Sequence, residues 1–374
     1  MNDRTRVVAA VGLTILLFLG VQLGALALIE PFTESDRQAV ENPQNPTNSI
    51  LYFAVMLAAT GLMLAAFRYD LEWLIKLLLV GVSVMISWYV FAELVPPVAG
   101  PFVSDGIADG LAIVASLAVG VALLWYPEWY VIDSAGIVMG AGAAALFGIS
   151  FGILPSLLLL TVLAVYDAIS VYGTEHMLDL AEGVMDLKIP VVLVVPTTLS
   201  YSYLAAGSTD DVLENGGEET TVEDEPVSEA NAADDAALDD TDAATTATGT
   251  DSVDDTDAAG TATGTDSADD DSESTALERD ALFIGLGDAV IPTVLVASAA
   301  SFLDLPTAAV PGITVNLPAL GALIGTLVGL LVLMHMVLKG RPHAGLPLLN
   351  GGAIGGYLLG ALASGLSLTA ALGF

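Results

Sequence analysis

The sequence contains no cysteine among its 374 residues. Disulfides, thiolate metal sites and cysteine nucleophiles are therefore excluded. It has only three histidines, and none pairs with another at the i, i+4 spacing of a zinc-protease helix. Gly148–Gly152 matches Gly-x-Ser-x-Gly literally, but it lies in a minimal turn between two apolar runs and not between a strand and a helix, as a serine nucleophile elbow does.

Basic residues are scarce as well. Nine Lys and Arg stand against 44 Asp and Glu, and the formal net charge is −35. Of these acidic residues, 25 lie between Asp210 and Asp280, where Arg279 is the only basic residue. Such a charge excludes nucleic-acid binding, which needs a basic surface. Heavy acidity on a solvated segment is typical of proteins adapted to high salt and predicts a halophilic source.

Hydrophobic residues are in excess, at 55% of the chain with a mean hydropathy of +0.74. Nine apolar runs are long enough to cross a bilayer as helices. A cleaved signal peptide is the alternative for the first run, but its apolar core is too long for one. We expect an all-α polytopic membrane protein with nine transmembrane helices. The predicted spans are Val7–Ile29, Ile50–Phe67, Trp73–Val95, Ile107–Trp125, Tyr130–Phe147, Phe151–Tyr172, Ala281–Ser301, Gly312–Leu338 and Leu346–Leu372.

The region between the sixth and seventh spans divides the chain into three parts. Residues 1–206 hold six spans and a juxtamembrane segment, and residues 281–374 hold the last three. Residues 207–280 are a low-complexity acidic segment, too polar to bury a core, and are predicted to form a disordered loop. Before that loop, Thr174–Lys188 is expected to form a short interfacial helix. Ile189–Ala205 is apolar but short and carries two prolines, which predicts a re-entrant or extended segment.

The basic residues predict the orientation. With the N-terminus in the cytoplasm, eight of the nine fall on the cytoplasmic side, and only Arg37 falls outside. This is a strong positive-inside bias. If Ile189–Ala205 also spanned the membrane, Arg279, Lys339 and Arg341 would all move outside, so nine spans are preferred. The acidic loop then lies in the cytoplasm.

Two aspartates lie inside predicted spans. Asp167 is five residues before the end of the sixth span, roughly 7–8 Å below the interface, and Asp288 is seven residues into the seventh, roughly 10 Å below it. An intramembrane carboxylate is costly and is a functional-site candidate by default. Gly285 and Gly287 precede Asp288 and would let a backbone approach it closely. We expect Asp167 and Asp288 to share one site.

Paired carboxylates in a low dielectric cannot both ionise cheaply, so they share a proton. The ionised one can then take a proton from water while the other donates to a carbonyl oxygen. That is aspartyl-protease chemistry, with no metal and no cofactor. A proton relay in a transporter is an equal alternative from the spacing alone. Glu93 and Asp133 are expected near span ends, solvated and without a catalytic role.

Three motifs in order resemble the presenilin and signal-peptide-peptidase family of intramembrane aspartyl proteases. They are Tyr166-Asp167 in the sixth span, Gly285-Leu286-Gly287-Asp288 in the seventh, and Pro347-Leu348-Leu349 at the start of the ninth. The nine spans and the long cytoplasmic loop also fit, and archaeal presenilin homologues are the most similar members. The resemblance implies that Asp167 and Asp288 are catalytic and that Tyr166, Gly285, Leu286 and Gly287 shape the site.

The third motif in this family is usually Pro-Ala-Leu, and the sequence offers two candidates. Pro318-Ala319-Leu320 matches literally but lies near the outer end of the eighth span. Pro347-Leu348-Leu349 follows a basic turn and begins the ninth span from the cytoplasmic side, at about the depth of the aspartates. We therefore assign the motif to Pro347, Leu348 and Leu349, although Leu replaces the usual Ala at the middle position.

The resemblance implies an endopeptidase of the cell membrane that cuts transmembrane helices or remnant signal peptides. A prepilin-type peptidase, which also uses Gly-x-Gly-Asp, and a proton-coupled transporter are the alternatives. The β-branched run from Ile189 to Pro196 could pair with an unwound substrate as an added strand, or could simply anchor at the interface. The sequence does not indicate an oligomeric state.

Overall fold

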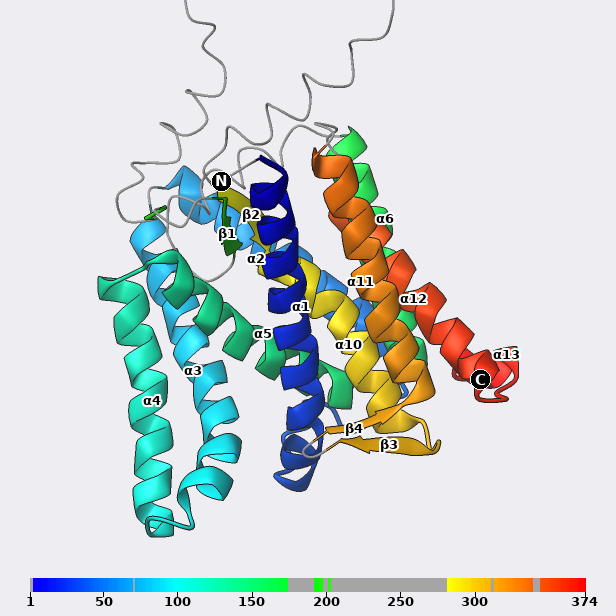
Figure 1. Ribbon diagram of the computed structural model, residues 1–374, viewed down its shortest axis with the longest axis horizontal. Helices are drawn as coiled ribbons and strands as arrows, with labels where there is room; N and C mark the ends of the chain where they lie inside the picture. Colours follow the sequence, from blue (N-terminus) through cyan, green and yellow to red (C-terminus); the bar gives the residue numbers. More distant parts are fainter. Residues whose placement is uncertain are drawn as a thin grey trace, which may run out of the picture.

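The structure is a computed structural model that describes residues 3–69, 71–173, 192–197, 201–202, 281–310, 313–338 and 344–374. Its helices run mostly along one direction and form a bundle (Figure 1). The described helices are α1 (Asp3–Glu34), α2 (Thr47–Arg68), α3 (Glu72–Ala99), α4 (Asp105–Trp125), α5 (Trp129–Ser150), α6 (Ile153–Gly173), α10 (Leu286–Phe302), α11 (Leu317–Leu338), α12 (Gly345–Ala363) and α13 (Leu368–Ala371).

Eight of these helices are long and apolar enough to cross a membrane, and α10, with 17 residues, is a shorter apolar helix. The chain is therefore a multi-pass membrane protein. The seventh predicted span differs from the prediction, because its first five residues form a strand and the helix begins only at Leu286. The ninth span also ends early, at Ala363, after which the chain turns and forms α13.

Two short antiparallel strand pairs interrupt the expected all-helical pattern. β1 (Val192–Pro196) pairs with β2 (Ala281–Gly285), so two segments on either side of the acidic region meet. β3 (Thr307–Val310) pairs with β4 (Ile313–Asn316) in the connection between α10 and α11. Apolar runs of five residues are too short to show from sequence whether they continue a neighbouring helix. The expected loop 207–280 and interfacial helix Thr174–Lys188 fall outside the described residues.

The β1–β2 pair lies at the end of the bundle where the N-terminus lies, and the β3–β4 hairpin lies at the opposite end (Figure 1). The expected orientation makes the first end cytoplasmic. β1 also agrees with the expectation that Ile189–Ala205 contains an extended segment.

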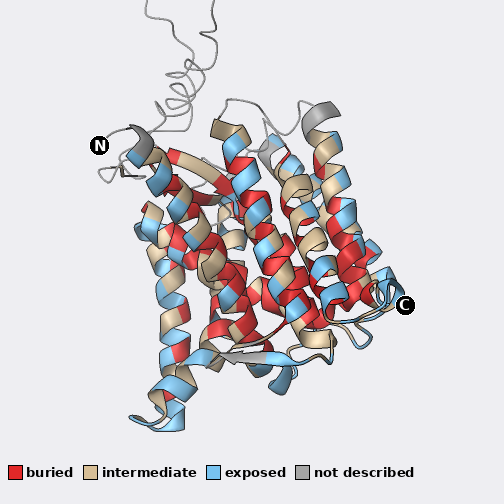
Figure 2. Ribbon diagram, turned by 45° about the vertical axis from the view of Figure 1, so that its right-hand side comes forward, coloured by how far each residue is buried: buried red, intermediate tan, exposed pale blue. Residues whose placement is uncertain are grey.

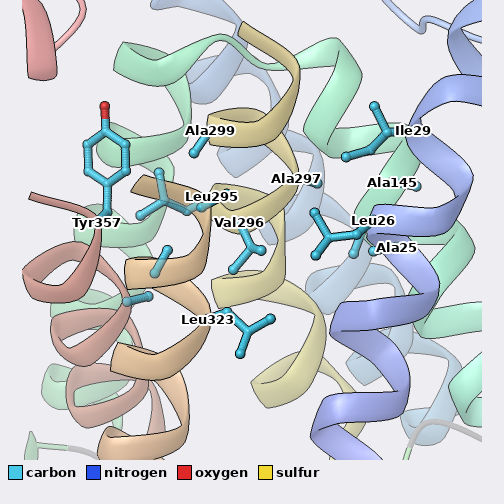
Figure 3. Close-up of a cluster of buried hydrophobic side chains, with 14 of the residues drawn as sticks. Ala25, Leu26, Ile29, Ala145, Leu295, Val296, Ala297, Ala299, Leu323 and Tyr357 are labelled. Atoms are coloured by element: carbon cyan, nitrogen blue, oxygen red, sulfur yellow. The ribbon is translucent and has the colours of Figure 1, made fainter. Parts of the chain in front are cut away.

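Helix α10 lies inside the bundle, with α1, α5 and α11 around it (Figure 1). Leu295, Val296, Ala297 and Ala299 are fully buried and form one apolar cluster with residues of α1, α5, α11 and α12 (Figure 3). Buried residues concentrate in the middle of the bundle and exposed ones on its outer helices (Figure 2). With 17 residues, α10 is at the short end of the lengths that span a bilayer, and other helices surround it.

Candidate active site

Asp167 lies on α6 and is 7% exposed. Its Oδ2 accepts the backbone N–H of Leu346, at 3.1 Å. Leu346 is the second residue of α12, and the first N–H groups of a helix have no partner within that helix. Asp167 therefore supplies a missing acceptor, and the bond holds the start of α12 against α6.

Asp288 is the third residue of α10, and its side chain is partly buried. A Cβ added at Gly345, the first residue of α12, would lie 3.5 Å from Asp288 Oδ2. Each carboxylate thus lies beside one of the first two residues of α12. Asp288 lies there in the first turn of its helix, rather than seven residues into a span as expected.

The residues before Asp288 divide into one buried and two exposed positions. Leu286 is 8% exposed and packs against α5, where a Cβ at Gly140 would lie 3.2 Å from its Cδ1. Gly285 and Gly287 are exposed, and a Cβ at Gly287 would meet nothing closer than Ile291 Cδ1, at 3.9 Å. Packing inside the chain therefore does not require glycine at position 287.

The two candidates for the third motif lie far apart. One is at the start of α12, and the other is at the start of α11, beside the opposite end of α12. Pro347, Leu348 and Leu349 directly follow the two residues of α12 that lie beside the aspartates, and Leu349 is fully buried. Pro318 lies at the start of α11, where a Cβ at Gly360 would come within 2.8 Å of its Cα. Gly360 is 15 residues beyond Gly345, or roughly 22 Å along the helix. The literal Pro-Ala-Leu therefore lies far from both aspartates.

Tyr166, next to Asp167, turns its ring toward α2. The ring makes an edge-to-face contact with Phe53, with centroids 5.8 Å apart. The Tyr166 ring thus lies between α6, which also carries Asp167, and α2.

Asn350 was missed by the sequence reasoning. It is fully buried on α12, and its Nδ2 donates to the Leu160 carbonyl of α6, at 2.9 Å. This bond ties α12 to the helix that carries Asp167. The sequence does carry a signal for such a contact, because a polar residue within an apolar span usually faces the interior of the bundle.

The expectation that Asp133 and Glu93 are solvated is wrong for Asp133, and the Glu93 side chain is also only 14% exposed. Asp133 is buried, at 4% exposed, and accepts the N–H of Val194 in β1. It lies near a span end, as expected, but is not solvated. Glu93 pairs with Arg37, at 3.0 Å.

No group of three or more His, Asp or Glu side chains suited to a metal ion occurs in the described part of the chain. What the site contains is two carboxylates and the start of a helix. Two adjacent carboxylates can divide the roles of general base and general acid between them. The geometry thus supports hydrolysis by an activated water, provided that one carboxylate is ionised and the other protonated.

Two carboxylates on two helices of a multi-pass membrane protein are compatible with the class of intramembrane aspartate proteases. Comparison with known families gives the same result. The family model described as signal-peptide peptidase, presenilin aspartyl protease matches residues 15–222 and 254–366, which include both aspartates and the Pro347 motif. The chain belongs to this family.

Two solved structures are similar to this chain. Both are described as a presenilin family intramembrane aspartate protease, one in space group C222 and one in P2. The first is 28% identical over 94% of this chain and 99% of its own, with a TM-score of 0.55. The second is 29% identical over 93% and 96%, with a TM-score of 0.53. The search of curated proteins found no match.

Proposed function

We propose that this protein is an intramembrane aspartyl endopeptidase whose catalytic pair is Asp167 and Asp288. The observation that carries the proposal is the position of both carboxylates beside the first two residues of α12. Family membership supports the same activity and speaks against a prepilin-type peptidase or a transporter. The substrates are transmembrane helices or remnant signal peptides in the bilayer.

In this mechanism the ionised carboxylate removes a proton from a water molecule, which attacks the scissile carbonyl carbon. The protonated carboxylate donates its proton to the carbonyl oxygen. The intermediate then collapses as the carboxyl that took the water proton gives it to the departing amine and the other carboxylate takes a hydroxyl proton back. The chain's own contribution is to orient the carboxylates. Leu346 N–H holds Asp167, and the strand pair leads directly into the first turn that carries Asp288.

The remaining site residues shape the space around the pair. We assign Gly285 and Gly287 to substrate clearance, Leu286 to fixing the motif on α5, and Tyr166 to the α2 side of the site. Pro347, Leu348 and Leu349 form the wall at the start of α12. The acidic region 207–280 is a cytoplasmic connection between the two membrane parts, 1–206 and 281–374. The cell membrane of a halophilic archaeon is the setting that the acidic composition favours.

The proposed pairing of β1 with a substrate strand needs revision. β1 already pairs with β2, and its Val194 N–H is bound by Asp133. A substrate strand could add to β1 only by displacing one of them. Binding of an extended substrate at this end of the molecule therefore does not use the centre of β1.

The catalytic assignment is tested by Asp167→Asn and Asp288→Asn in reconstituted enzyme. Each change keeps the side-chain size but removes one of the two acid–base groups, so each is expected to abolish cleavage of a single-span helical substrate. The measurement is mass spectrometry of the products, with wild type as the reference. Cleavage that persists in either variant would refute the assignment.

A further inference from the structure

Asp133 is a buried carboxylate that the catalytic mechanism does not use. It is the fifth residue of α5, and its Oδ1 accepts the Val194 N–H at 2.8 Å. Its Oδ2 is also buried and has no hydrogen-bond partner among the described residues. A buried carboxylate with one unsatisfied oxygen costs stability. Stability alone therefore does not account for an acid at this position.

The bond from Val194 shows which edge of β1 faces α5. Val194 lies opposite Phe283 of β2. Because its N–H goes to Asp133, it is not used in the β1–β2 ladder, and in an antiparallel pair such outward positions alternate along the strand. Pro196, two residues on, shares this edge, where its missing N–H breaks no ladder bond. Helix α5 therefore closes the outer edge of β1 at its centre.

The same face of α5 also holds the start of α10. Asp133, Gly136 and Gly140 follow the i, i+3, i+7 spacing of one helix face. A Cβ at Gly136 would lie 2.9 Å from Leu193 Cδ2 of β1, and a Cβ at Gly140 would lie 3.2 Å from Leu286 Cδ1. One face of α5 thus contacts both β1 and the motif that carries Asp288.

Two further contacts tie the chain around β1 to the bundle. Arg6 of α1 donates to the Thr197 carbonyl, at 3.4 Å, directly after the strand. Ser202 donates to Glu128 Oε1, at 2.6 Å, just before α5 begins. β1 is therefore held by α1 and α5 rather than by its pairing with β2 alone.

The position of Asp288 depends on this attachment. β1 and β2 pair residue by residue from Pro196–Ala281 to Val192–Gly285. The next residue after Gly285 begins α10, so no linker separates the strand from the turn that contains Asp288. A shift of β1 on α5 would move β2, and with it the start of α10.

We propose that Asp133 is a positioning residue for the protease reaction. By holding β1 on α5, it sets through the β1–β2 register where Asp288 lies relative to Asp167 and to the scissile bond. Asp133 is not part of the acid–base pair and is not a catalytic residue. The proposal rests on the proposed function of Asp167 and Asp288.

The test uses the full-length enzyme in lipid vesicles with a single-span substrate. Asp133→Ala removes the acceptor, whereas Asp133→Asn keeps an oxygen at Oδ1; Ser134→Ala, at an exposed neighbouring position, is the matched control. For Asp133→Ala we expect kcat to fall by about 10–100-fold, as misplacement of about 1 Å can cause, and KM to change by less than about threefold. Mass spectrometry should show additional cleavage positions. Asp133→Asn should restore kcat and the single pattern.

Val194→Pro gives an independent test, because it removes the donor without removing a β1–β2 ladder bond. If the Asp133–Val194 bond is what matters, Val194→Pro should reproduce the shifted cleavage pattern. The double variant with Asp133→Ala should then lose no more kcat than the single variants. If Asp133→Ala does not fold, Val194→Pro and Asp133→Asn provide the test instead.

Three results would overturn the proposal. They are wild-type kcat and cleavage pattern in folded Asp133→Ala, a lowered unfolding temperature with kcat per folded enzyme unchanged, and multiplicative losses in the double variant. The proposed function fails separately, through cleavage by Asp167→Asn or Asp288→Asn. If Asp167→Asn and Asp288→Asn are inactive while Asp133→Ala is unaffected, the catalytic pair is supported and only the positioning role of Asp133 is rejected.

Discussion

At the scale of single residues, glycines in this protein occur in two different surroundings. At Gly287 an added Cβ would meet nothing closer than 3.9 Å among the described residues, so that part of the chain leaves the space beside Gly287 open. At Gly325 on α11, an added Cβ would overlap the carbonyl oxygen of Gly352 on α12. The first glycine leaves room for something outside the chain, and the second is required by packing inside it.

Gly287→Ala is therefore expected to separate activity from stability. Alanine favours the helix by up to about 1 kcal/mol relative to glycine, so the unfolding temperature should stay equal or rise slightly. If a substrate backbone passes at this position, kcat/KM should fall by about tenfold or more, which is ~1.4 kcal/mol of transition-state stabilisation. Cleavage kinetics and thermal unfolding measure the two effects.

Gly81→Ala is the matched control for Gly287→Ala. Gly81 is an exposed helical glycine of α3 with nothing within 4 Å of an added Cβ, and α3 lies on another side of the bundle. Equal losses of kcat/KM in the two variants, or none in Gly287→Ala, would contradict substrate clearance at position 287.

At the scale of elements, α11 and α12 pack backbone to backbone. Glycines recur at every fourth residue on both helices, and an added Cβ at any of them would overlap or crowd the partner helix. Small residues at this spacing allow such close packing in membrane helices. Because α12 begins beside both aspartates, this interface also fixes one wall of the site. The glycines are Gly321, Gly325 and Gly329 on α11 and Gly352, Gly356 and Gly360 on α12.

Gly325→Ala is expected to force the two helices apart. Overpacking of this kind costs about 1–3 kcal/mol, and more where backbone atoms collide. The unfolding temperature should fall, and activity should fall with it because α12 carries the Leu346 N–H that binds Asp167. Gly355→Ala, on the same helix pair but with nothing within 4 Å, should leave activity unchanged and the unfolding temperature equal or slightly higher. Similar stabilities for Gly325→Ala and Gly355→Ala would contradict this account.

At the scale of the whole molecule, the absence of cysteine makes the orientation directly measurable. A single introduced thiol is the only one in the chain. Ser104→Cys, before α4, is expected to react with a membrane-impermeant maleimide in intact cells. Tyr69→Cys, in the turn between α2 and α3, should react only after permeabilisation. Both side chains are exposed, so the contrast reports the side of the membrane. The reverse pattern would place the N-terminus outside.

Most helices were predictable because an apolar run of about 20 residues has few stable alternatives in a bilayer. The spans near α1 to α6 agree with the structure to within several residues at their ends. The prediction was wrong where strands replace helical turns, at Ala281–Gly285 and Ile313–Asn316. Five apolar residues carry too little periodicity to separate a strand from a helix, and the pairing partner of β2 lies almost 90 residues earlier in the chain.

The sequence by itself determined the membrane class, and it predicted the two candidate aspartates and the choice of Pro347 over Pro318. Each of these depends on composition, on residue type or on position along the chain. Only the tertiary structure decided that both aspartates lie beside the start of α12, that Asp133 is buried against β1, and that Asp288 lies in the first turn of a helix directly after a strand. These contacts join residues as many as 179 positions apart. Local patterns carry no information about such pairs, because packing of the whole bundle brings them together.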